Sequence, residues 1–259
     1  MTDLHVTQWG EGEPVVMVHG SFGWGEDTFG KQRPLSDHYK LLLVDRRGFG
    51  KSPQAIRVDF APDAQDIAEI LGDGAHLVGH SYGAVVSLVA AARRPRAIKS
   101  LTVIEPPAFQ IARDDPVVAG AIQHYGAIYE TGMKSTPQQF YASFTGRNLN
   151  TIPSLSEDDT RAIRSSMTER PPWEADIPLE EIVQSSYPKL VVSGGRQRNS
   201  RGMAFVKICD ILEKDLRAQR LVFEGTAHNP QLEQPELFNT ALRGFLDSAS
   251  VRSRLAEKD

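Results

Sequence analysis

A serine flanked by glycines, set between two apolar segments, constrains this 259-residue chain more than any other feature. Residues 75–78 form a short apolar run that is typical of a buried strand, and the small residues of 84–92 favour a helix. The pentapeptide 79–83, Gly-His-Ser-Tyr-Gly, therefore predicts a sharp turn from strand to helix. Such a turn strains the serine backbone and requires glycine where the neighbouring backbones crowd. We expect Ser81 to stand exposed at the carboxyl edge of a sheet.

Composition limits the class of protein and the class of partner. The length and the 40% of hydrophobic residues suffice for one large α/β domain that can carry an insertion. The formal charge is −4, and the absence of a basic run predicts a small-molecule partner rather than nucleic acid or a membrane surface. No segment has the length and apolarity of a membrane span or a signal peptide, which predicts a cytoplasmic protein. The single cysteine, Cys209, is expected in the core.

A second loop that can act on a bound substrate follows the first apolar strand. The apolar run 15–18 leads directly into the loop 19–23, His-Gly-Ser-Phe-Gly, whose glycines let the backbone turn outward and present N–H groups. If this loop lies beside Ser81, its N–H groups and that of Tyr82 form an oxyanion hole. Ser21 and Phe22 are both candidate donors, and an ordinary strand-to-loop turn is the alternative interpretation.

A histidine near the end of the chain completes the pattern. Residues 221–223 predict the last strand, and His228 ends the loop that follows it. The chain resembles the α/β-hydrolases. The resemblance is carried by His228 together with the loop 19–23, the Asp-Arg-Arg-Gly-Phe-Gly-Lys-Ser loop at 45–52 and the pentapeptide 79–83. This resemblance implies a serine, acid and histidine in that chain order, with His228 as the general base.

The resemblance also implies an α/β fold with a particular domain plan. The expected core is a mostly parallel, twisted sheet flanked by helices, formed by residues 1–105 and 188–259. Residues 106–187 are expected to be a helical cap over the site, because prolines break this segment into helix-length pieces. The cap segment is rich in aromatic residues, which favours an apolar or aromatic substrate of modest size.

The acid departs from the commonest family pattern. In many relatives an aspartate follows the strand that leaves the cap, whereas here Gln197 stands in that position. An amide cannot balance the charge of an imidazolium. Glu105, however, follows the predicted strand 99–104, and consecutive parallel strands usually lie side by side, so its carboxylate is expected near Ser81. Certain lactonases and haloalkane dehalogenases resemble this chain in taking their acid from that strand.

The expected chemistry is that of a serine hydrolase without a cofactor. Ser81, His228 and Glu105 would cleave an ester or a lactone through an acyl-enzyme. Cys/His pairs at metal-ligand spacing and a phosphate-binding glycine loop are not found in the sequence, so no metal or organic cofactor is expected. The same site chemistry leaves carbon–carbon bond hydrolysis and cofactor-free perhydrolysis open. A non-catalytic protein that binds a small molecule is the alternative if Glu105 is irrelevant.

Overall fold

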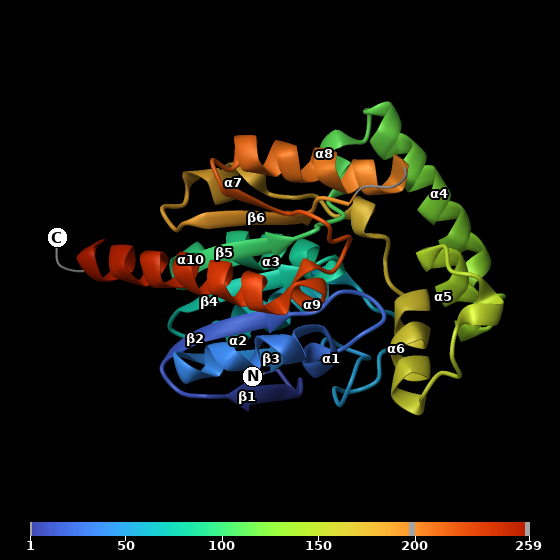
Figure 1. Ribbon diagram of the computed structural model, residues 1–259, viewed down its shortest axis with the longest axis horizontal. Coiled ribbons are helices and arrows are strands. Elements are labelled where there is room, and N and C mark those ends of the chain that lie inside the picture. The colour runs from blue at the N-terminus through green and yellow to red at the C-terminus, as the bar shows by residue number, and fades with distance from the viewer. Residues whose placement is uncertain (1, 197–199, 257–259) are drawn as a thin grey trace.

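The architecture is an α/β sandwich built on one seven-stranded sheet (Figure 1). The computed structural model describes residues 2–196 and 200–256. The strand order is β1-β3-β2-β4-β5-β6-β7, with β1 antiparallel to β3 and the other pairs parallel. The strands are β1 Val6–Trp9, β2 Glu13–Val18, β3 Tyr39–Val44, β4 Ala75–His80, β5 Ile98–Ile104, β6 Lys189–Gly194 and β7 Gln219–Phe223. This confirms the expected mostly parallel sheet.

Helices cover both faces of the sheet. The helices are α1 Gly25–Phe29, α2 Phe60–Ile70, α3 Tyr82–Arg93, α4 Pro116–Gly132, α5 Pro137–Thr145, α6 Glu157–Met167, α7 Leu179–Gln184, α8 Ser200–Asp215, α9 Pro230–Glu233 and α10 Pro235–Ala256. One hydrophobic cluster joins the sheet to α2, α3, α7 and α8, and a second joins its other face to α1 and α10. None of the helices in the described ranges is long and apolar enough to cross a bilayer.

Alternating side chains of the central strands supply the two clusters. Val16 and Val18 of β2 pack with the first cluster, whereas Val15 and Met17 pack with the second, and all four are fully buried. A strand that is buried on both faces must be apolar at consecutive positions. This is why the central strands appear in the sequence as continuous hydrophobic runs.

The segment between β5 and β6 is helical and lies mostly away from the sheet. Figure 1 shows α4, α5 and α6 grouped at one end of the sheet, whereas α7 returns to the face that carries α3. Two of the three outlying helices begin at capping boxes, in which Thr136 and Ser156 accept from backbone amides of the first turn. The sequence of this segment therefore fixes where α5 and α6 begin.

The parallel pairing of β4 with β5 sets the position of the site. His80 is in register with Ile104, so the residues that follow the two strands, Ser81 and Glu105, leave the sheet at the same edge. The Ser81 N–H donates to the Ile104 carbonyl oxygen at 2.8 Å, and the Glu105 N–H donates to the Val192 carbonyl oxygen at 2.9 Å. These bonds hold the two residues to their neighbouring strands.

At the opposite edge of the sheet, Glu13 joins three elements of the core. Its carboxylate accepts hydrogen bonds from Lys99 Nζ of β5 and Ser250 Oγ of α10, each at 2.5 Å. Its Oε2 lies 3.6 Å from Nε2 of His76, in β4. Partial burial favours a higher pKa for Glu13, but the bonds from Lys99 and Ser250 outweigh it and lower the pKa to about 2.

We predict that Glu13→Gln lowers the free energy of unfolding at pH 7 by about 1–2 kcal/mol, which is less than the full pKa shift implies because solvent screens this partly exposed carboxylate. Because the pKa of Glu13 is lower in the folded chain than in the unfolded chain, its stabilising effect is present above about pH 4.5 and disappears as the pH falls towards 2. Urea unfolding of both proteins from pH 7 to pH 3 measures this. Glu11→Gln, at an exposed position of the same turn, is the control. A difference that does not change with pH would contradict the prediction.

Candidate active site

Ser81 occupies the sharp turn between β4 and α3 with a backbone that L-residues rarely adopt. Its φ and ψ are 52° and −123°. The glycines on either side are required sterically, since a Cβ at Gly79 would lie 2.5 Å from the Gly83 carbonyl oxygen and a Cβ at Gly83 would lie 2.2 Å from the Val18 carbonyl oxygen. The predicted strand, turn and helix are thus all present, and the crowding predicted for the two glycines is confirmed.

His228 reaches Ser81 from the loop that follows β7. Its Nε2 lies 2.9 Å from Ser81 Oγ. The neighbouring His80 ring fixes the backbone of this loop, because His80 Nε2 donates to the His228 carbonyl oxygen at 3.0 Å. Burial, together with the nearby His228, lowers the pKa of His80 to about 3, so His80 stays neutral and holds the loop without adding a charge.

Glu105 lies on the far side of the His228 ring. The side chain is only 2% exposed. Its Oε1 accepts from the Gly194 N–H at 2.8 Å, and its Oε2 lies 3.3 Å from His228 Nδ1. The structure therefore brings Ser81, His228 and Glu105 into one chain of polar contacts. This is the geometry in which an imidazole can take a proton from a hydroxyl while a carboxylate balances its charge.

Strained backbone is concentrated around this group. Four non-glycine residues in the described ranges have a positive φ, and three of them, Phe22, Ser81 and Glu105, line the same cavity. A non-glycine residue in this region costs on the order of 1–3 kcal/mol, and such residues cluster at functional sites. The strain supports the assignment of this cavity as the active site.

The loop after β2 lies directly against Ser81. A Cβ at Gly20 would lie 2.8 Å from Ser81 Cβ, which places the following residue, Ser21, beside the serine. The Phe22 N–H donates to Ser166 Oγ at 2.9 Å, and the Ser21 hydroxyl donates to Glu169 Oε2 at 2.5 Å. Tyr82 is the first residue of α3, where helix N–H groups have no partner within the helix.

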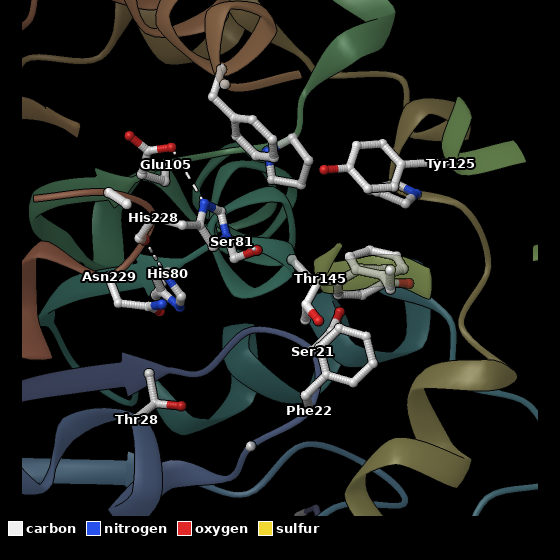
Figure 2. Close-up of a pocket in the computed structure, with 18 of the residues that line it drawn as sticks. Ser21, Phe22, Thr28, His80, Ser81, Glu105, Tyr125, Thr145, His228 and Asn229 are labelled. Atoms are coloured by element: carbon white, nitrogen blue, oxygen red, sulfur yellow. Dashed lines mark hydrogen bonds and ion pairs between the residues drawn. The ribbon is translucent and has the colours of Figure 1, made fainter. Parts of the chain in front are cut away.

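The cavity above these residues has a volume of about 800 Å³. Figure 2 shows Ser81 between the His228 ring and the part of the wall that carries Ser21, Phe22 and Tyr125. Aromatic side chains form a large part of the wall: the lining rings are Phe22, Tyr82, Phe109, Tyr125, Tyr129, Tyr141, Phe144, Trp173 and Phe205. Six of these come from the segment between β5 and β6, whereas Phe140 of the same segment is buried within its own helical cluster. The arrangement can enclose a mostly apolar molecule over a polar floor.

Sequence reasoning missed a buried ionic cluster behind this wall. Arg46 is fully buried and donates to Asp63 Oδ2 at 2.9 Å and to Glu169 Oε1 at 2.7 Å. The guanidinium also donates to the carbonyl oxygens of His19 and Gly20, so it holds the loop after β2 in place. In the sequence, the loop at 45–52 contributed only to the family resemblance. Glu169 carries no periodic or motif signal that relates it to Arg46.

Two further expectations concern the acid and metals. Gln197, which occupies the usual position of the acid, lies outside the described residues. Within residues 2–196 and 200–256, no group of three or more His, Cys, Asp or Glu side chains is arranged to hold a metal ion. Cys209 is buried, as expected, and burial raises its pKa above the ordinary thiol value.

Comparisons with known proteins agree with the fold and the class of site. The model of the Alpha/beta hydrolase family matches residues 15–241. A pimeloyl-[acyl-carrier protein] methyl ester esterase of Aeromonas salmonicida is 30% identical over 94% of this chain and 99% of the relative. Esterase YbfF of Escherichia coli is 25% identical over 90% of this chain and 93% of the relative. The structure of Est816, described as an N-acyl homoserine lactone degrading enzyme, superposes with a TM-score of 0.67 at 20% identity, covering 93% of this chain and 96% of Est816.

We predict that Gly194→Ala destabilises the fold by about 1–3 kcal/mol. The added Cβ would lie 2.0 Å from the Ala227 carbonyl oxygen and would push away the loop that carries His228. Gly244→Ala, in the middle of α10, is the control, since nothing lies within 4 Å of its Cβ and alanine favours a helix. Thermal unfolding should show opposite shifts for the two variants. Equal shifts would contradict the tight packing of Gly194.

Proposed function

Because this chain belongs to the alpha/beta hydrolase family, we propose that it is a serine hydrolase with Ser81 as its nucleophile. Its substrate is an ester or a lactone of a small, mostly apolar or aromatic compound. The observation that carries the proposal is the 2.9 Å contact between Ser81 Oγ and His228 Nε2, with His228 Nδ1 turned to Glu105. The esterases among the relatives support the ester-cleaving class.

In the first step, His228 Nε2 accepts the proton of Ser81 as Oγ attacks the substrate carbonyl carbon. The imidazolium that forms is stabilised by Glu105, whose charge faces Nδ1 from 3.3 Å. The Gly194 N–H fixes the other carboxylate oxygen, so the carboxylate keeps its orientation towards the ring. His228 then gives the proton to the leaving alcohol, and the acyl group remains on Ser81.

The negative charge on the carbonyl oxygen is held by two backbone N–H groups. We assign these to Tyr82 and to Ser21, because the Phe22 N–H is already directed at Ser166 Oγ. Each such donor stabilises the tetrahedral intermediate by about 3 kcal/mol. In the second half of the reaction, His228 activates a water molecule, which attacks the acyl carbon and releases Ser81.

Residues 106–187 act as a cap in this proposal, with residues 1–105 and 188–259 as the catalytic core. The cap supplies six of the aromatic rings around the cavity, so it sets the shape and apolarity of the acyl or alcohol site. Closing apolar walls around the reacting carbonyl excludes water and strengthens the electrostatic interactions beneath. The reaction needs no metal or organic cofactor in this mechanism.

We expect the wild-type protein to react with one equivalent of a fluorophosphonate and to hydrolyse short p-nitrophenyl esters. Ser81→Ala should do neither, with a loss of turnover on the order of 10⁴-fold or more. Intact mass spectrometry measures the labelling, and absorbance measures the hydrolysis. A wild-type protein that neither labels nor turns over would favour a small-molecule binding protein instead.

A separate experiment identifies the acid. Glu105→Gln should reduce kcat about a thousandfold, because an amide cannot stabilise the imidazolium, whereas Gln197→Ala should leave kcat within about twofold. Steady-state kinetics on the same p-nitrophenyl esters compare the two variants. Similar losses in both would refute the assignment of Glu105.

A further inference from the structure

Two hydroxyl groups of the cavity wall share one buried carboxylate. Ser21 Oγ donates to Glu169 Oε2 at 2.5 Å, and the Tyr129 hydroxyl lies near enough to the same carboxyl group to help lower its pKa. Ser21 and Tyr129 line the cavity, whereas the Glu169 side chain is fully buried behind them.

The ion pair with the fully buried Arg46, whose Nη2 lies 2.7 Å from Glu169 Oε1, favours the ionised form of Glu169. Burial raises the pKa of Glu169 above its ordinary value, and Arg46 and Ser21 oppose part of that rise. The other carboxyl on Arg46 is the better site for a proton, because Asp63 Oδ1 has no hydrogen-bond partner among the described residues and burial raises the pKa of Asp63 to about 6. Both oxygens of Glu169, in contrast, accept hydrogen bonds.

An ionised carboxylate accepts hydrogen bonds and cannot donate them. The hydroxyl groups of Ser21 and Tyr129, which face this carboxylate, must therefore act as donors towards Glu169. What remains to each oxygen is its lone pairs, which can only accept a hydrogen bond from a bound molecule. Because aromatic rings such as Phe22, Tyr125 and Phe144 also line this cavity, the two oxygens form a local acceptor site beside apolar surface.

The acceptor site lies close to the reacting bond. Ser21 follows Gly20, whose backbone is packed against Ser81. A substrate whose carbonyl carbon is within reach of Ser81 Oγ therefore places its nearest substituents beside Ser21.

We propose that Ser21 and Tyr129 select substrates that carry a hydrogen-bond donor, a hydroxyl or an amide N–H, one or two carbons from the scissile carbonyl. An entirely apolar substrate displaces water from both oxygens and leaves them without a donor, which is unfavourable in a cavity. A substrate with a donor replaces that lost hydrogen bond. The inference rests on the proposed function, because it assumes that the scissile carbonyl is held at Ser81.

The first test compares methyl esters that differ in a single group. Methyl 3-hydroxybutanoate carries the donor, methyl 3-methylbutanoate is its apolar isostere, and methyl 3-methoxybutanoate carries an acceptor only; the corresponding 2-substituted esters form a second set. With release of acid followed by pH-stat titration, kcat/KM should favour the hydroxy ester about tenfold over both analogues in at least one set. No preference in either set would overturn the inference.

Two variants test whether the hydroxyl groups of Ser21 and Tyr129 cause the preference for the hydroxy ester. Ser21→Ala retains the backbone N–H of the oxyanion hole but removes the acceptor oxygen, and Tyr129→Phe removes the other; each should lower the preference at least threefold. Tyr141→Phe is the matched control, because it removes a hydroxyl from the same cavity lining but leaves Ser21, Tyr129 and Glu169 unchanged. A preference that survives in both Ser21→Ala and Tyr129→Phe would overturn the inference.

Binding separates this inference from the proposed function. In Ser81→Ala, chemical-shift titrations give the Kd of each ester without turnover. Tighter binding of the hydroxy ester, by about tenfold, supports the acceptor site even if the wild-type protein proves inactive. Equal Kd values for the hydroxy ester and its apolar isostere contradict it, even if the wild-type protein is an active esterase.

Discussion

The close approach of α3 to the end of β2 is the constraint on which the site depends. At Gly83 the backbone of α3 is so near the Val18 carbonyl oxygen that no side chain fits between them. This contact brings the loop after β2 against Ser81. In the proposed mechanism, it thereby places backbone N–H groups of two separate segments beside the substrate carbonyl oxygen. A larger residue at position 83 would separate them, because the core on both sides is close-packed and cannot yield.

A single buried cation gives the neighbouring loop its rigidity. Arg46 lies between the rings of Phe49 and Tyr82, with ring centroids 4.4 Å and 4.6 Å from its Cζ. Removing a charge from water is costly, so a buried guanidinium persists only when its donors are satisfied. Here those partners include two carboxylates and two backbone carbonyls, and Glu169 is contributed by the segment that follows α6. The same ion therefore couples the cavity wall to the sheet.

The parts of the molecule that local chemistry determines could be predicted from the sequence. Glycine spacing and apolar runs gave the turn at Ser81, and the neighbouring parallel strands placed Glu105 beside it. The edge strand β1 was missed, because it is short and only partly buried. Glu169 was missed for a different reason: it pairs with Arg46 across 123 residues, and nothing local in a sequence records such a contact. The shape of the cavity likewise depends on side chains from many elements.

In the proposed mechanism the acid directly follows β5, and this position makes the chain tolerant of changes in the later segment. Ser81 and Glu105 leave adjacent strands and are held to the sheet by backbone hydrogen bonds, both before the long segment between β5 and β6 begins. An insertion or deletion within 106–187 alters the register of neither. Evolution can therefore lengthen, shorten or replace most of residues 106–187 and still keep the Glu105 carboxylate and the Ser81 hydroxyl in place. Only His228 depends on the strands that follow this segment. Descendants of such a chain can diverge in substrate while conserving their chemistry.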